Sequence, residues 1–308
     1  MPELPEVETV RRMLAAHVPG QRIARASVSK RRLRTASLAR LPGRLLGRTF
    51  GEPQRTGKFL LLGLDEGYTL LSHLGMSGRW LYWASGRAPD AALAHVHLRL
   101  ELEGGAHLWY QDVRRFGMLR VLRTDALGRD ASLRLLGPDP LVAPPTGESL
   151  RALARGSRTS LKSFLLDQRR IAGLGNIYVS EILFRAAVDP RRRAGALAPA
   201  EWSRVAAEIV PVLEASIARM GTTFSTYRTI WNEPGEYGEQ LLVYDRAGEA
   251  CPRCGEPVRR IVQSGRSTFF CPRCQSRAAA RSRDVTSRPN ARRSSAAGRT
   301  TPGRASKP

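Results

Sequence analysis

The sequence predicts an α+β protein with two folded parts and a basic tail. Apolar residues recur at every second position within residues 22–122, which is the period of half-buried β-strands. After a stretch rich in proline and glycine, the apolar period becomes that of α-helices. All 4 cysteines then lie in two C-x-x-C pairs. We therefore expect an N-terminal helix with an antiparallel β-sandwich, a helical second domain, a four-cysteine β-hairpin and a disordered tail.

Length and charge point to a nucleic-acid partner. The 308 residues are enough for two domains with separate cores. The formal charge of +23, from 50 Lys and Arg against 27 Asp and Glu, favours a polyanion such as DNA. Apolar runs fall short of the roughly 18 residues that span a membrane, and Glu3 and Glu6 oppose a signal peptide. We expect a cytoplasmic, nucleoid-associated protein.

The first residues combine a helix with a candidate nucleophile. Apolar side chains lie three or four positions apart and predict a helix that ends near residues 19–20: Val7, Val10, Leu14 and Val18. If Met1 is removed, Pro2 has a free α-amine, whose pKa of about 8 leaves part of it unprotonated at neutral pH. Such an amine can form an iminium, and Glu3 can transfer the proton that this step needs. Pro5 and Glu6 would equally suit an ordinary helix start.

Lysine is rare in this arginine-rich chain and occurs only at Lys30, Lys58, Lys162 and Lys307. A buried ammonium can lose its proton and act as an acid or base, whereas a guanidinium stays charged. Lys58 and Lys162 are therefore candidate functional residues. Lys30 lies beside two arginines and Lys307 lies in the tail, so both are expected to be solvated charges.

The β-rich part is predicted from short apolar runs. Alternation is clearest over residues 96–102, and further runs lie at 59–64, 68–74 and 117–122. Lys58 lies at the start of one predicted strand. Together these runs suggest an antiparallel sandwich or barrel.

Two loops of this part carry side chains that suit DNA. Met76 lies in a glycine-flanked loop at 73–78, and Arg114 and Phe116 lie in a loop at 112–117. Ordinary hairpin turns would explain both loops. Both also fit an enzyme that flips a base from a duplex, because an apolar side chain can fill the hole and an arginine can read the orphaned base.

The second part is predicted to be helical. A rigid linker at 137–147 separates it from the first, and a cleft between the two is the expected DNA site. Helices are expected at 148–155, 160–168, 176–187 and 199–219, and Pro211 should kink or divide the last one. Gly173 and Gly175 would allow close backbone approach, and Asn176 would cap a helix whose N–H groups hold a phosphate. A plain glycine turn is the alternative. The domains are placed at 2–136, 148–240 and 241–275.

The cysteine pairs predict a metal site. Cys251 and Cys254 are separated from Cys271 and Cys274 by the spacing of a tetrahedral four-cysteine Zn²⁺ site. Disulfides are the alternative, and the expected cytosolic location disfavours them. The intervening residues predict a hairpin with its turn near 264–265, on which a structural zinc would hold Arg266.

The tail at 276–308 is rich in Arg, Ser, Ala, Pro and Gly. It has too few large apolar residues to offset chain entropy, so we expect it to be disordered. It can be a solvated appendage, or it can follow the DNA backbone through its basic groups.

Five segments, in this order, resemble the formamidopyrimidine-DNA glycosylases, which are bifunctional base-excision repair enzymes. They are residues 2–12, 73–78, 112–117, 165–178 and the cysteine pairs, and the resemblance covers about residues 2–275. It implies a monomeric DNA glycosylase with AP-lyase activity, a helix–two-turn–helix motif and one structural Zn²⁺. The implied partner is duplex DNA that carries an oxidised purine, either 8-oxoguanine or a ring-opened formamidopyrimidine.

The resemblance also implies roles in the chemistry. Pro2 is implied to attack C1′ of the damaged nucleotide while Glu3 supplies a proton that helps to open the sugar. The iminium makes the neighbouring C–H acidic, so β-elimination and then δ-elimination follow and leave a one-nucleotide gap. Lys58 is the implied proton donor for β-elimination. Arg266 is implied to contact a phosphate and to take part in δ-elimination.

Contacts near the flipped base are implied in the same way. Met76, Arg114 and Phe116 are implied to form the set that fills the hole in the duplex. His95 is implied to contact DNA near the site.

Contacts of the second part are implied as well. Lys162 and Asn176 are implied to bind the DNA backbone, and residues 221–240 to include the loop that closes over the flipped base. Arg158 is a further expected DNA contact. Ser157 stands beside it where some relatives carry lysine, which leaves the identity of one phosphate contact open.

Two alternatives remain at the level of sequence. The sister group that removes oxidised pyrimidines shares the nucleophile and fold, but its members typically begin Pro-Glu-Gly-Pro, so Leu4 favours the purine branch. A zinc-ribbon DNA-binding protein without catalysis is the second alternative. The presence of Pro2, Glu3 and Lys58 argues against it.

Overall fold

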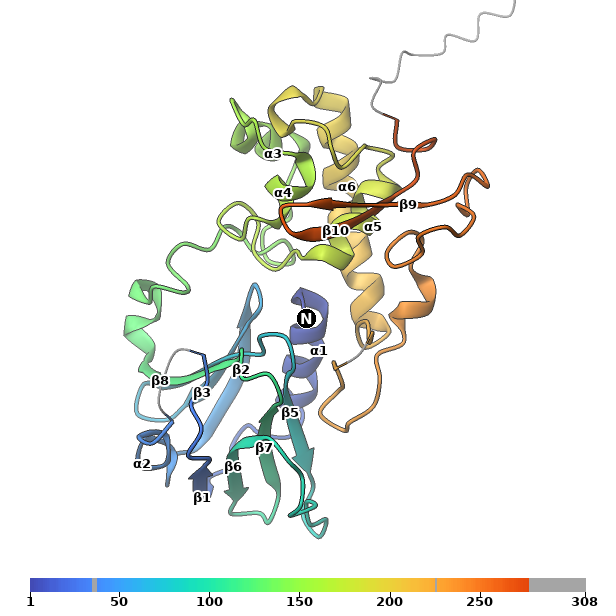
Figure 1. The fold of residues 1–308 in the computed structure, drawn as a ribbon. Helices are drawn as coiled ribbons and strands as arrows, with labels where there is room; N and C mark the ends of the chain where they lie inside the picture. The colour runs from blue at the N-terminus through green and yellow to red at the C-terminus, as the bar shows by residue number, and fades with distance from the viewer. Residues whose placement is uncertain (35–37, 225, 277–308) are drawn as a thin grey trace, which may run out of the picture. The chain divides into compact units, whose positions relative to one another are not determined.

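The computed structural model describes residues 1–34, 38–224 and 226–276, so nearly all of the predicted tail lies outside the described residues (Figure 1). The first part of the chain forms α1 (Leu4–Ala15), β1 (Ile23–Val28), α2 (Leu41–Leu45), β2 (Phe50–Thr56), β3 (Phe59–Leu64), β4 (Tyr68–His73), β5 (Gly78–Trp83), β6 (Val96–Leu102), β7 (His107–Asp112), β8 (Met118–Arg123) and the 3₁₀ helix η1 (Thr124–Arg129). The predicted runs at 59–64, 68–74 and 117–122 correspond to β3, β4 and β8.

These strands form the predicted β-sandwich. Two four-stranded antiparallel sheets have the orders β1-β6-β7-β5 and β2-β3-β4-β8. Leu60 from one sheet lies in the same buried cluster as Trp80 and Leu98 from the other. The two sheets therefore share one core, as inner faces of a sandwich do.

His97 of β6 is a polar residue of the alternating run at 96–102 that is nevertheless buried. Its Nδ1 hydrogen-bonds with Ser29 Oγ at 2.8 Å, and its Nε2 with the Asp112 carbonyl at 2.9 Å. Both ring nitrogens are satisfied, which is what allows a histidine to be buried at this position.

Helix α1 is anchored in two cores. Leu4 packs into the helical part, whereas Val7, Val10 and Leu14 pack into the sandwich. The helix ends at Ala15, earlier than predicted, because a turn follows in which the N–H of Val18 donates to Leu14 O. Val18 is nevertheless buried, so the apolar pattern continues past the helix. The N-terminus is thereby fixed between the two parts.

The second part is helical, as predicted. It contains α3 (Gly147–Ala154), α4 (Leu161–Leu166), α5 (Asn176–Arg185), η2 (Ala194–Ala196), α6 (Pro199–Ala218) and η3 (Tyr237–Gln240). Pro211 does not divide α6, which runs as one helix through it. The neighbouring residues Ile209, Val212 and Leu213 are fully buried, so packing holds the helix across the position where proline removes a hydrogen bond.

The chain then forms the predicted hairpin of β9 (Arg259–Gln263) and β10 (Arg266–Phe270). Ser264 and Gly265 make its turn with positive φ angles of 49° and 73°, as a two-residue turn of type I′ requires. Phe269 packs against Phe184 of α5 in a buried cluster that includes two of the cysteines. The hairpin is therefore fixed on the helical part (Figure 1).

The predicted linker is tied to the sandwich. Asp139 accepts a hydrogen bond from the N–H of Gly57 at 2.8 Å and forms an ion pair with the buried guanidinium of Arg55. The same guanidinium contacts Glu8 of α1 at 3.0 Å. These contacts fix the turn before β3, where Lys58 lies.

Across the described residues, every helix is too short or too polar to span a bilayer.

Candidate active site

A cavity of about 190 Å³ brings together residues from all three structured regions. Its lining includes Met1, Lys58 and His73 from the N-terminal part, Asn176 from α5 and Arg266 from the hairpin. Pro2 is buried directly behind Met1. Removal of Met1 would thus leave the Pro2 nitrogen as a free amine beside this cavity.

The backbone that follows Pro2 is held by two hydrogen bonds. The N–H of Leu4 donates to Gly173 O at 3.1 Å, and the N–H of Glu3 donates to Glu6 Oε2 at 2.7 Å. Glu3 is the N-cap of α1, so a capping box fixes its backbone. Leu4 lies so close to Gly173 that a side chain at that position would overlap with it. The glycine predicted to allow close approach does so, toward the N-terminus.

Glu3 is a buried carboxyl with one partnered oxygen. Its Oε1 accepts a hydrogen bond from the N–H of Ile177 at 3.0 Å, and no group among the described residues donates to Oε2. Burial raises the pKa of Glu3, and the positive charge of Lys58 opposes that shift. A side chain on Gly175 would overlap with the Glu3 carboxyl, so this glycine makes room for it. A carboxyl that retains its proton can serve as a general acid.

Glu6 links α1 to the helical part. The sequence analysis assigned it only a place at the start of a helix. Its Oε1 accepts hydrogen bonds from the N–H of Thr222 at 2.8 Å and from the hydroxyl of Tyr178. Burial raises the pKa of Glu6, and the negative charge of Glu3 adds to the shift. The capping-box spacing was the one available signal, and it did not reveal these partners from more than 170 residues away.

Lys58 is buried at the mouth of β3 and lines the cavity. Burial lowers the pKa of its ammonium, while the charges of Glu3 and Glu6 oppose that shift. Gly57, with φ of 56°, makes the turn before it. Lys58 is therefore a desolvated amine beside a desolvated acid, an arrangement that suits proton transfer.

His73 lines the cavity, and the sequence analysis assigned it no individual role. Its Nδ1 accepts a hydrogen bond from the N–H of Gly75 at 3.0 Å, and its ring lies against Phe59. Burial lowers the pKa of His73 to about 4, so the ring is neutral at neutral pH. With Nδ1 an acceptor, Nε2 carries the ring hydrogen as a donor.

Lys162, which is expected to contact the DNA backbone, is buried in this structure. The side chain is only 1% exposed, and its Nζ donates to Ser267 O at 2.6 Å. Burial lowers the pKa of Lys162 to about 7. The ammonium of α4 thus holds the backbone of β10 at the residue next to Arg266.

Asn176 lines the cavity, but it does not cap α5. It is the first residue of that helix, and Gly175 is the N-cap. Its Nδ2 donates to the hydroxyl of Tyr244 at 3.4 Å. The predicted cap failed because the Glu3 carboxyl satisfies a first-turn N–H group that a cap would otherwise bind.

The two predicted DNA loops lie side by side. Gly75 has no room for a side chain because the backbone of Phe116 lies against it. Phe116 is 43% exposed, and the Arg114 guanidinium lies 4.9 Å from the centre of its ring. Met76 is half-buried in the neighbouring loop. An exposed aromatic, an arginine and a methionine thus share one edge of the sandwich.

The loop at 112–117 is built on a buried acid. Asp112 accepts hydrogen bonds from the hydroxyl of Ser77 at 2.5 Å and from the N–H of Gly117 at 2.7 Å. The remaining predicted contacts His95, Arg158 and Arg266 are exposed. Their side chains are free to meet a ligand from solvent.

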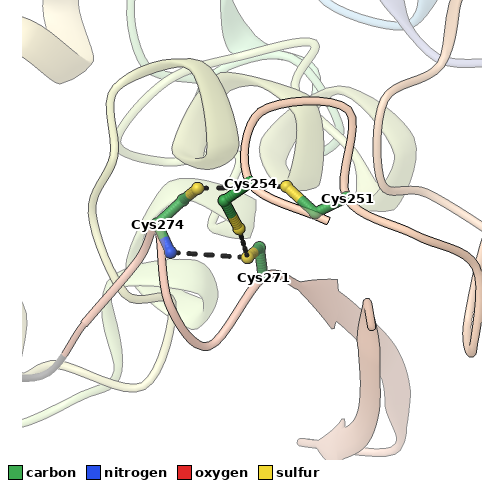
Figure 2. A group of neighbouring side chains, drawn as sticks. All are labelled: Cys251, Cys254, Cys271 and Cys274. Carbon is green, nitrogen blue, oxygen red and sulfur yellow. Dashed lines mark hydrogen bonds between the residues drawn. The ribbon is translucent and has the colours of Figure 1, made fainter. Parts of the chain in front are cut away.

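The four cysteines converge (Figure 2). Their sulfur atoms all lie within 4.8 Å of one another, with 3.9 Å between Cys251 and Cys274 and 3.5 Å between Cys254 and Cys271. Four thiolates around one Zn²⁺ at about 2.3 Å would lie about 3.8 Å apart. All four cysteines are free, so the disulfide alternative does not hold. The donor set fits one structural zinc with no open coordination position.

Comparisons with known families cover most of the chain. Residues 1–119 match the formamidopyrimidine-DNA glycosylase N-terminal domain, residues 136–228 match the H2TH domain of the same glycosylases, and residues 248–277 match a zinc finger found in FPG and IleRS. The chain is 44% identical over 275 residues to a formamidopyrimidine-DNA glycosylase of Methylococcus capsulatus. The aligned residues make up 89% of this chain and 100% of the relative.

Solved structures agree. A Lactococcus lactis FPG mutant in complex with DNA containing Fapy-dG is similar with a TM-score of 0.81 and 34% identity, over 89% of this chain and 100% of that one. The wild-type Lactococcus lactis FPG in complex with DNA containing an oxidised pyrimidine is similar with a TM-score of 0.80 and 33% identity, over the same shares of the two chains.

Proposed function

The chain belongs to the formamidopyrimidine-DNA glycosylase family, and on that premise we propose that it excises oxidised purines from duplex DNA in base excision repair. The substrates are 8-oxoguanine and ring-opened formamidopyrimidines. The observation that carries the proposal is the cavity lined by Met1, Lys58 and Gly175. Pro2 directly follows Met1 in the chain, and the Glu3 carboxyl lies against Gly175. We further propose that the protein acts as a monomer on the DNA of the bacterial nucleoid.

The chemistry assigned to the cavity begins at Pro2. Once Met1 is removed, the Pro2 nitrogen attacks C1′ of the damaged nucleotide, the C1′–N bond to the base breaks, and the base leaves with that electron pair. The attached Pro2 nitrogen then loses its own proton, which balances the proton that the departing base takes up. Its freed electron pair forms the iminium as the bond from C1′ to the ring oxygen breaks, and Glu3 gives a proton to that oxygen. The buried position of Glu3 supports this role because burial raises the pKa of the carboxyl and so favours its protonated form.

The iminium makes the C2′–H acidic, and loss of that proton expels the 3′ phosphate by β-elimination. Lys58 is proposed as the proton donor in this step, since it lines the cavity and its pKa is lowered toward the working range. Arg266 is proposed to bind a phosphate and to assist the δ-elimination that follows. Zinc on the cysteines would fix the hairpin that carries Arg266.

The exposed residues are proposed to hold the DNA. Met76, Arg114 and Phe116 would fill the hole left by the flipped base, in keeping with their shared position at one edge of the sandwich. Three further residues are proposed to contact the DNA near the site or along its backbone: His95, Asn176 and Arg158.

A cleavage panel tests this function. Duplexes that carry 8-oxoguanine, a formamidopyrimidine or an oxidised pyrimidine, each opposite all four bases, are incubated with the full chain. We expect the two purine lesions to be excised and the strand to be cut to a one-nucleotide gap. Absence of excision from every purine duplex would overturn the proposal.

Excision of oxidised pyrimidines is the second candidate activity. The observation that favours it is the complex of the Lactococcus lactis relative with DNA that contains an oxidised pyrimidine. Faster turnover of the pyrimidine duplex than of the purine duplexes would move this chain to that activity.

A further inference from the structure

After α6 the chain returns to the β-sandwich. We call residues 226–233 the returning segment. Tyr227 and Ile230 of this segment are buried, at 4% and 1% exposure, in the same cluster as Trp80 and Leu98 of the sandwich. The returning segment follows helices α3 to α6 in sequence. It is nevertheless part of the N-terminal core.

The returning segment is bound along the free edge of β5. That strand is the last of its sheet, so its outer backbone groups are open to a partner. The N–H of Tyr82 donates to Ile230 O at 3.0 Å. At the other end of the edge, the Thr226 hydroxyl donates to Met76 O at 2.9 Å. The segment therefore contacts the loop that carries the proposed wedge residue.

Side chains hold the tip of the returning segment. The Arg79 guanidinium donates to Asn232 Oδ1 at 2.8 Å and to Gln111 Oε1 at 2.6 Å. Asn232 adopts a positive φ of 67° in a turn closed by the N–H of Thr229, which donates to Glu233 O at 2.8 Å. An amide side chain tolerates this conformation and at the same time supplies the acceptor for Arg79.

Trp231 covers the same tip. Its ring makes edge contacts with Tyr82 at 5.4 Å and with His17 at 5.1 Å, and those two rings are stacked on each other. Trp231 is 40% exposed and lines a groove of about 870 Å³ together with Arg79 and Arg87. The rings of His17, Tyr82 and Trp231 thus connect the turn after α1, strand β5 and the returning segment.

The other end of the same connection is fixed near the cavity. Glu6 accepts from the N–H of Thr222, and the N–H of Tyr237 donates to Gly221 O at 3.0 Å. Thr222 and Thr226 are therefore each held by a hydrogen bond to the N-terminal part. Both lie within the region 221–240, which is expected to close over the flipped base.

We propose that Arg79, Trp231 and Asn232 are positioning residues for base excision. They fix the returning segment on β5 and so hold Thr226 against Met76. We call the region 221–240, in which Thr226 lies, the closing loop. This inference rests on the proposed function. None of the three touches the cavity, so they act through the loop. Removal of their contacts should slow steps that need a flipped base in place and spare steps that do not.

The test compares two reactions of the full chain. Single-turnover excision of 8-oxoguanine needs the closed loop, whereas strand cleavage at a preformed abasic site has no base to enclose. For Asn232→Gly and Trp231→Ala we expect excision to slow about three- to ten-fold, the size of one lost hydrogen bond or ring contact, with abasic-site cleavage within about two-fold of wild type. Asn232→Asp keeps an acceptor for Arg79 and should retain the wild-type ratio of the two rates.

Arg87→Ala is the matched control, because it removes a guanidinium from the same groove and leaves the Arg79–Asn232 hydrogen bond intact. Its rate ratio should equal that of wild type. Equal slowing of both reactions in Asn232→Gly, or an unchanged ratio in both Asn232→Gly and Trp231→Ala, would overturn the inference. Failure of the wild-type chain to excise any purine lesion would instead reject the proposed function itself.

Discussion

The wall of the cavity and the edge of the sandwich are close in space but opposite in exposure. Glu3 and Lys58 are buried, whereas Arg114 and Phe116 are exposed. Burial shifts the pKa of Glu3 upward and that of Lys58 downward, which brings an acid and an amine toward the range where both exchange protons. Exposure leaves the other pair able to enter a duplex. Chemistry and recognition thus require contrary environments, and the loops at 73–78 and 112–117 lie where the two meet.

The largest expected effect follows from blocking the Pro2 nitrogen. An N-terminal extension or retained Met1 leaves it an amide, which cannot form an iminium. Borohydride should trap the processed chain covalently on lesion DNA and should trap none of the blocked form. A tag at the C-terminus is the control. Equal trapping of the two forms would reject Pro2 as the nucleophile and would point to another amine of the chain.

Replacement of Lys58 tests whether the buried wall acts through charge or through proton transfer. Lys58→Arg keeps the charge but not the transferable proton, so β-elimination should slow about 10²- to 10⁴-fold, nearly as much as in Lys58→Ala. Rates are measured at a preformed abasic site under saturation. Near-normal cleavage by Lys58→Arg would mark the residue as a phosphate clamp.

Removal of one cysteine tests whether zinc supports the exposed Arg266 on the β9–β10 hairpin. Cys254→Ser should abolish the single bound zinc and weaken binding of lesion DNA about 100-fold or more, since Arg266 loses its rigid support. The sandwich has a separate core, so its near-ultraviolet signal should persist. Metal content by elemental analysis and affinity by titration check this together, and a zinc-free wild-type chain that binds DNA normally would contradict it.

Phe116→Ala should have a smaller effect. Loss of an aromatic that stacks on bases costs roughly 1–3 kcal/mol, so the Kd for a duplex with an abasic analogue should rise about ten-fold. Val113→Ala alters an exposed apolar residue of the same loop and is the matched control. If both variants lose affinity equally, the loop acts through its general apolar surface and the wedge assignment fails.

The smallest effect is expected from the basic tail. From residue 277 the tail carries nine basic groups against Asp284. If three of them pair with phosphates at a time, a chain that ends at Ser276 should show a log K versus log salt slope flatter by about 2.7, from roughly 0.9 per phosphate. The saturated chemical step should not change. Superimposable slopes for the two chains would show that the tail does not contribute to binding.

The sequence by itself determined the features that depend on local patterns. Period-two runs predicted the sandwich, and the spacing of the cysteines predicted the zinc hairpin down to its turn at 264–265. The scarcity of lysine selected Lys58, and the N-terminal Pro-Glu pair selected the proposed nucleophile and its acid. Each of these signals depends only on residue types and their spacing along the chain, so no knowledge of the fold was needed to find them.

Only the tertiary structure decided which of these residues are desolvated and what they contact. Lys162 was expected on the DNA, yet its partner is Ser267, which lies 105 positions away. Glu6 binds Thr222 from 216 positions away, and the returning segment completes the core of a domain it follows. Burial and long-range partners depend on how separate elements pack together. The residue spacing within one segment therefore cannot predict them.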